Sequence, residues 1–98
     1  MYQVIILDKA LDDVQEAIYY YESQSKGLGE RFETELNDFL HALETNPFFE
    51  SRYDEVRCIP LKLFPFMVHF TVNEQGLEVI VHAVFHTSLN PTAWQRRD

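Results

Sequence analysis

Three histidines in the C-terminal half are the residues best suited to chemistry. His69, His82 and His86 fall in two runs of alternating apolar and polar residues, which are typical of β-strands. His82 and His86 lie about 13 Å apart along a strand, whereas a metal ion holds its ligands at about 2 Å. We therefore expect no metal site and no cofactor, and we interpret the histidines as packing or surface residues of a sheet.

Phosphodiester cleavage is the other chemistry that these residues suggest. It needs a general base, a general acid and a cation that stabilises the transition state. His86 and Arg57 are the candidate catalytic residues, and Glu78 and Lys62 offer further parts. Nothing in their spacing assembles them into one site. The sequence therefore favours a protein that is not an enzyme, with an endoribonuclease as the alternative.

The elements that position these residues begin with two amphipathic helices. Asp8 is expected to cap the first helix with its carboxylate, and Gly27 to end it with a positive φ. The second helix begins at Gly29 or Glu30 and ends at Asn46, because a residue before proline avoids the helical region. The short connection predicts an antiparallel hairpin. The expected buried stripes are Leu11, Val14, Ile18 and Tyr21, then Phe32, Leu36, Phe39, Leu40 and Leu43.

A small sheet is predicted to pack on this hairpin. Proline cannot donate a ladder hydrogen bond, so Pro60 predicts a bend or an edge position. Two alternating runs around the turn 73–76 indicate a β-hairpin, with Gly76 expected to take a positive φ. The expected strands are residues 2–7, 55–63, 66–72 and 77–86, with a loop over 48–54.

The resulting order, β-α-α-β-β-β, is that of an α+β fold with an antiparallel-rich sheet and the helices on one face. Alternation predicts that the helices cover the face with the Phe66 and Leu77 series. The opposite face is expected to carry Met67, His69, Thr71, Ile80, His82 and His86.

Composition limits the classes of function. The 98 residues are 46% hydrophobic and carry a net charge of −8, as expected for one folded domain, residues 1–98. No apolar run reaches the ~20 residues of a membrane span, and the first residues do not resemble a signal peptide. The lone Cys58 is expected to be a small buried hydrophobe in a reducing cytoplasm. Residues 8–46 hold ten acids and three bases, which disfavours direct nucleic-acid binding.

Motifs along nearly the whole chain resemble the RelE/ParE superfamily of bacterial type II toxins, and its ParE-like branch in particular. It is the order and the spacing of these motifs together that resemble the family. They are Ala10-Leu11-Asp12-Asp13, Tyr19-Tyr20-Tyr21-Glu22, Gly27-Leu28-Gly29-Glu30-Arg31-Phe32, Leu43-Glu44-Thr45-Asn46-Pro47, Arg57-Cys58-Ile59-Pro60-Leu61, Phe64-Pro65-Phe66 and His86-Thr87-Ser88-Leu89-Asn90-Pro91-Thr92-Ala93-Trp94.

The resemblance implies a toxin, of the kind also called a plasmid-stabilisation protein, that a cognate antitoxin holds inactive. ParE-like members imply DNA gyrase as the target, and RelE-like members imply ribosome-dependent cleavage of messenger RNA. Family members often carry arginines just after the equivalent of His86, where this chain has Thr87-Ser88-Leu89. A decayed toxin that keeps only antitoxin binding is therefore a third alternative. The expected partner-binding residues are Arg57, Lys62, His69, His82, His86, Trp94, Arg96 and Arg97.

Overall fold

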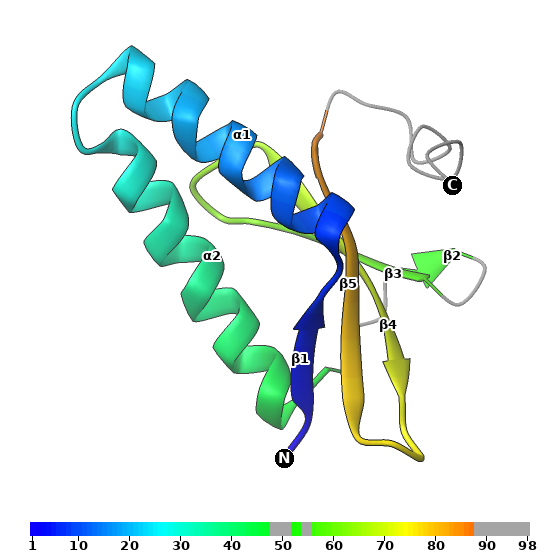
Figure 1. The fold of residues 1–98 in the computed structure, drawn as a ribbon. Helices are drawn as coiled ribbons and strands as arrows, with labels where there is room; N and C mark the ends of the chain where they lie inside the picture. The colour runs from blue at the N-terminus through cyan, green and yellow to red at the C-terminus, as the bar shows by residue number, and fades with distance from the viewer. Residues whose placement is uncertain (48–51, 54–55, 88–98) are drawn as a thin grey trace.

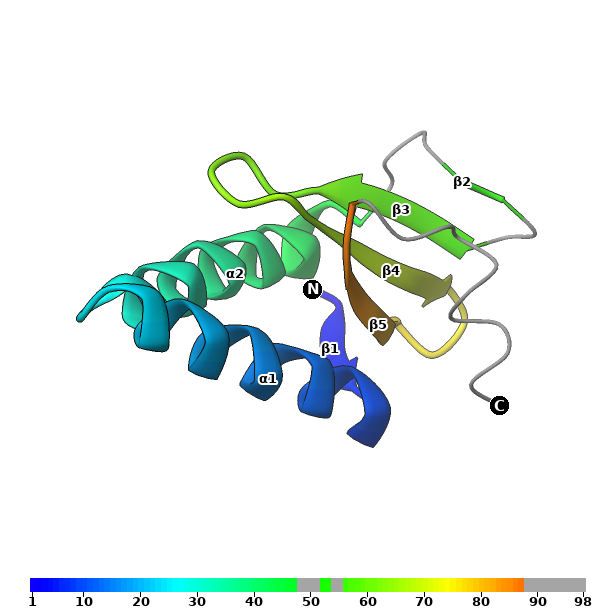
Figure 2. The ribbon, with the colours of Figure 1, turned by 90° about the horizontal axis from the view of Figure 1, so that it is seen from above.

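The computed structural model describes residues 1–47, 52–53 and 56–87. Its sheet has five strands in the order β1-β5-β4-β3-β2. The two helices lie side by side as an antiparallel hairpin on one face of the sheet (Figures 1 and 2). The predicted α+β class and element order are confirmed. The elements are β1 (Gln3–Ile6), α1 (Asp8–Gln24), α2 (Leu28–Thr45), β2 (Arg52–Tyr53), β3 (Val56–Pro60), β4 (Phe66–Asn73) and β5 (Glu78–His86).

The strands follow the predicted runs closely, with one addition. β1 pairs in parallel with β5, and β3, β4 and β5 pair antiparallel. The prediction that residues 48–54 form only a loop is wrong, because Arg52 and Tyr53 form a short strand beside β3. β3 stops at Pro60, three residues before the predicted end of this strand, because proline has no N–H to donate to a ladder.

The β4–β5 turn uses a different residue from the predicted one. Leu77, at φ 53°, is the positive-φ residue there, and Gly76 is not. The side chain of Asn73 accepts a hydrogen bond from the Gly76 N–H at 3.2 Å, and the turn lies at residues 74–77, one residue later than expected. A left-handed leucine costs free energy that glycine would not, and this strain is local to the turn.

A β-bulge interrupts the hairpin between β4 and β5. His69 pairs with Ala83, but Phe70 pairs with Val81, so His82 is an extra residue on β5. One inserted residue moves the side chains that follow it to the other face of the sheet. Val79 and Val81 face the helices before the bulge, and Val84 faces them after it. The predicted placement of Ala83 and Phe85 on the helix face is therefore wrong.

The buried face of α1 is built on small residues. Ala10, Val14 and Ala17 are its buried positions, whereas Leu11, predicted to be buried, is 42% exposed. Small side chains let the helix backbone approach the sheet closely, which turns the larger Leu11 outward. Asp8 is the first residue of the helix, Leu7 is the N-cap, and no side chain caps it, so the predicted Asp8 cap is wrong. The stripe predicted for α2 is confirmed.

Two residues stabilise the hairpin of α1 and α2: Gly29, where the helices make close contact, and Glu22, which accepts hydrogen bonds from the connection. Gly27 takes the expected positive φ of 87°, but it is the N-cap of α2, and Ser25 is the C-cap that ends α1. The Glu22 carboxylate accepts hydrogen bonds from the N–H groups of Gly27 and Gly29 at 3.0 to 3.1 Å. A Cβ on Gly29 would lie only 2.6 Å from the backbone oxygen of Ile18. Glycine at this position therefore lets the two helices touch.

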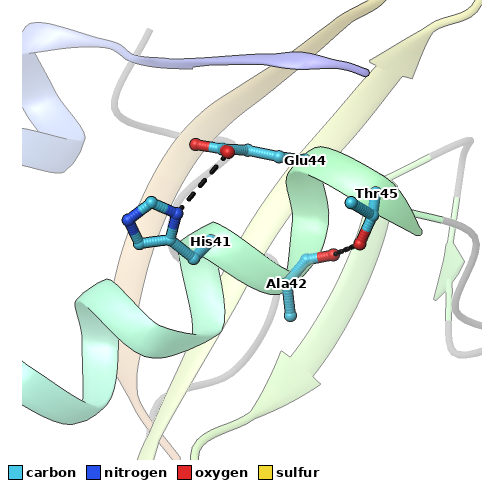
Figure 3. Close-up of polar contacts among 4 residues, drawn as sticks. All are labelled: His41, Ala42, Glu44 and Thr45. Atoms are coloured by element: carbon cyan, nitrogen blue, oxygen red, sulfur yellow. Dashed lines mark hydrogen bonds and ion pairs between the residues drawn. The ribbon is translucent and has the colours of Figure 1, made fainter.

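The C-terminal turn of α2 joins the helix to the first strand. His41 Nδ1 lies 3.5 Å from the Glu44 carboxylate, and the Thr45 hydroxyl donates to the Ala42 carbonyl at 3.3 Å (Figure 3). The backbone carbonyl of Glu44 accepts a hydrogen bond from the N–H of Tyr2 at 2.7 Å. This bond fixes the chain end that leads into β1 against the helix.

A single apolar cluster lies between the helices and the sheet. Its largest fully buried side chains include Phe32, Leu43 and Phe70. The Glu35 carboxylate accepts hydrogen bonds from the N–H groups of Lys62 and Leu63, which ties α2 to the segment between β3 and β4. No helix of the described residues has both the length and the apolar character to cross a membrane.

Candidate functional site

The sheet face away from the helices holds two of the three candidate histidines. His69 is 2% exposed, and its Nδ1 lies 3.4 Å from the Cys58 sulfur. His82 is half-buried, and its Nε2 lies 2.9 Å from the Thr71 hydroxyl. The expectation that Cys58 is a buried residue is confirmed.

Burial makes His69 a neutral side chain. Removal from water, and secondarily the charge of His82, lower the pKa of His69 to about 4. A histidine that stays neutral near pH 7 cannot supply positive charge to a phosphate or a carboxylate. His69 therefore has the character of a packing residue, bonded to Cys58.

His86 lies on the other face, among the residues that meet α1. It pairs with Phe66, and the two ring centroids are 5.4 Å apart. The prediction that His86 shares a face with His69 and His82 is wrong. His86 follows the bulge along β5, and beyond the bulge the alternation of faces is reversed. The three histidines do not form one cluster.

The two candidate catalytic residues are far apart. Arg57 on β3 pairs with Phe70, and His86 on β5 pairs with Phe66. Four residues of strand rise and two strand spacings separate them, which is on the order of 16 Å between Cα atoms. Lys62 is exposed in the segment after β3. The fold therefore does not bring Arg57 and His86, the two candidate catalytic residues, together.

A groove runs between α1 and the end of β5, with a volume of about 410 Å³. Two carboxylates and a tyrosine lie on its helix side, and both Glu16 and Tyr20 are exposed to solvent. Two further side chains, Phe66 and Val84, supply apolar surface from the sheet. We call this surface the α1–β5 groove, and its principal residues are Asp13, Glu16, Tyr20, Phe66, Val84 and His86.

Among the residues of this groove, only His86 was predicted from the sequence as a site residue. Tyr19 and Tyr20 are 81% and 57% exposed. The Asp13 Oδ2 accepts a hydrogen bond from the Val84 N–H at 3.0 Å. That contact spans most of the chain, so no local pattern signals it.

The remaining predicted site residues lie elsewhere. Trp94, Arg96 and Arg97, predicted to bind a partner, fall outside the described residues. Among the residues that the structure does describe, no three His, Cys, Asp or Glu side chains gather in a way that could hold a metal ion.

Comparison with known proteins places this arrangement in a family. Residues 4–91 match the family model described as the ParE toxin of type II toxin–antitoxin system, parDE. A comparison with curated protein sequences found no significant match.

Solved structures share the fold at low sequence identity. The chromosomal ParDE system from P. aeruginosa gives a TM-score of 0.65 at 19% identity, over 88% of this chain and 96% of the other. The intact E. coli RelBE complex gives 0.64 at 16%, over 88% and 96%. The isolated E. coli RelE toxin gives 0.65 at 14%, over 99% and 96%. The fold alone therefore does not separate the two branches.

Proposed function

This chain belongs to the ParE toxin family of type II toxin–antitoxin systems, and from that premise we propose that it acts by binding. In this proposal the toxin attaches to an essential protein of the bacterial cytoplasm, with a DNA gyrase as the expected target. A cognate antitoxin binds the toxin and neutralises it. The match of the family model over residues 4–91 is the observation that carries the proposal.

The geometry of the candidate residues supports binding over catalysis. Arg57 and His86 lie on the order of 16 Å apart by strand rise and spacing, and His69 is buried and neutral. An endoribonuclease would need an acid, a base and a cation around one phosphate. The described residues offer exposed carboxylates and tyrosines instead, and such side chains are suited to contacts with another protein.

An antitoxin partner has support from the relatives and from charge. The similar ParDE and RelBE structures are named as toxin–antitoxin systems. Residues 8–46 of this chain carry a net charge of −7, which favours association with a positively charged protein segment. We therefore expect the antitoxin to be basic where it meets the helices, and the complex to weaken as salt rises.

Expression of the toxin alone, and then with the neighbouring gene, tests the proposal. Induction alone should stop growth and reduce negative supercoiling of a reporter plasmid, and co-expression should restore both. Purified toxin should also inhibit supercoiling by gyrase in vitro. Unchanged growth and supercoiling would contradict the toxin proposal and favour a decayed toxin.

Replacement of two residues distinguishes the ribonuclease alternative. The double variant Arg57→Ala with His86→Ala should retain toxicity if the toxin acts by binding elsewhere on its surface. Loss of toxicity in a variant with unchanged circular dichroism, together with ribosome-dependent mRNA cleavage by the wild type, would establish the ribonuclease instead. Arginine introduced at Thr87 or Leu89 should add toxicity only in a decayed toxin.

A further inference from the structure

The α1–β5 groove combines negative charge, an exposed aromatic ring and an apolar floor. Glu16 and Tyr20 are one helical turn apart on α1, so their side chains are neighbours on its surface. Phe66 and Val84 line the same groove from the sheet. This set fits a side chain with an apolar stem and a flat cationic head, which among the natural amino acids is arginine.

We propose that the α1–β5 groove is where the antitoxin docks, by seating an arginine side chain between the Tyr20 ring and the Glu16 carboxylate. The inference rests on the proposed function and adds to it the surface and the chemistry of the partner. Guanidinium groups stack on aromatic rings and pair with carboxylates, whereas an ammonium group does only the second well. The arginine stem lies against the apolar side of the groove.

Tyr20 is held in position before any partner arrives. Its ring packs edge-to-face on Tyr21, with centroids 5.3 Å apart. Tyr21 in turn packs on Phe64 at 4.8 Å and on Phe32 at 5.5 Å, and Phe32 is fully buried. A half-exposed aromatic ring backed by a rigid core is typical of residues that dominate binding energy at interfaces.

Asp13 determines how the partner's backbone lies beside β5. The β1 ladder ends where Ile6 pairs with Val81, and beyond that point the Asp13 carboxylate accepts the N–H of Val84. A strand added along β5 would need this N–H. The partner segment therefore docks over the groove through its side chains, and Asp13 keeps its bond to Val84.

The negative charge of the groove favours a basic antitoxin over a second copy of this chain. A second copy of this chain carries a net charge of −8, and its own groove is acidic, so two copies repel each other here. A basic protein segment gains from the same field.

Binding of the purified product of the neighbouring gene tests this inference by calorimetry at two salt concentrations. Glu16→Lys and Tyr20→Ala should each weaken binding by about ten- to a hundredfold, as loss of a central interface residue does. Two matched controls lie outside the groove. Glu33→Lys makes the same change of charge on the solvent side of α2, and Tyr19→Ala removes the neighbouring ring, which is more exposed than that of Tyr20. Both should weaken binding by less than about threefold, as contacts outside the centre of an interface do.

Tyr20→Phe provides a further check, because it keeps the ring and removes only the hydroxyl. It should bind within about threefold of the wild type, since stacking on a guanidinium needs the ring face. Thermal unfolding confirms that each variant is folded. Equal effects of Glu16→Lys and Glu33→Lys would overturn the inference, as would loss of gyrase inhibition with unchanged antitoxin binding. Failure of the wild type to bind the antitoxin at all would instead overturn the proposed function.

Discussion

Replacement of Gly29 by alanine should separate the two helices and destabilise the protein. The added Cβ would lie 2.6 Å from the Ile18 backbone oxygen and 3.1 Å from the Cβ of Glu22. Ordinary carbon–oxygen contacts are at least about 3.3 Å. The helices must therefore move apart by roughly 0.7 Å, because the clashing oxygen belongs to the backbone and cannot rotate away.

The expected cost follows from three terms. Overpacking of a tight contact costs about 1–3 kcal/mol, and disturbance of the Glu22 hydrogen bond to the Gly29 N–H costs about 1 kcal/mol more. The higher helix propensity of alanine returns at most about 1 kcal/mol. We therefore expect Gly29→Ala to lower the free energy of unfolding by about 2 kcal/mol, which corresponds to roughly 8–16 °C in Tm for a domain of this size.

Urea unfolding followed by circular dichroism measures this loss, with Gly76→Ala as the control. A Cβ on Gly76 also meets an atom at 2.8 Å, but that atom is the side-chain nitrogen of Asn73, which can rotate away. Gly76→Ala should therefore lower the free energy of unfolding by no more than about 1 kcal/mol, through a weakened hydrogen bond from the Gly76 N–H to the Asn73 side chain. If Gly29→Ala and Gly76→Ala unfold at the same urea concentration as the wild type, the helices do not make the close contact described here.

Two further predictions concern His69 and Leu77. The pKa of His69 is about 4 in the folded chain and about 6.5 in an unfolded one, so the unfolded state binds more protons between these values. Stability should therefore fall by about 3 kcal/mol as the pH falls from 6.5 to 4. His69→Gln should remove most of this dependence of the free energy of unfolding on pH, and His41→Gln, at an exposed position, should keep it. Equal pH dependences of the two variants in urea titrations would refute the lowered pKa of His69. Leu77→Asn should raise the free energy of unfolding by about 0.5–1 kcal/mol, because asparagine tolerates the left-handed backbone at φ 53° better than leucine; an unchanged or lower urea midpoint would contradict the strain.

Local sequence patterns predicted the elements well. Alternation located β4 and β5 to within a residue or two, and the spacing of apolar residues gave the buried face of α2. Asn46 ends α2 as the following proline required. These features depend on neighbours in the chain, so the chain shows them directly. The α1 stripe was predicted less well, because a count of large apolar residues overlooks Ala10 and Ala17.

The bulge at His82 is the point at which alternation failed. A strand with one extra residue has the same composition as one without it, and only the pairing partner reveals the insertion. Because of the bulge, His86 and His69 lie on opposite faces of the sheet, although alternation had predicted them on the same face. A period-2 count is reliable up to the first bulge and reversed beyond it.

The α1–β5 groove depends on contacts that no local pattern encodes. Its carboxylates come from the first half of α1 and its floor from β4 and β5, which lie fifty or more residues further along the chain. Ala17 lines the groove and Ala10 is fully buried, and the small size of both side chains allows α1 to lie close to β5. The residues that carry no chemistry thus determine the depth of the groove. An alanine at position 17 should be as necessary to antitoxin binding as the charged residues around it, although it donates and accepts nothing through its side chain.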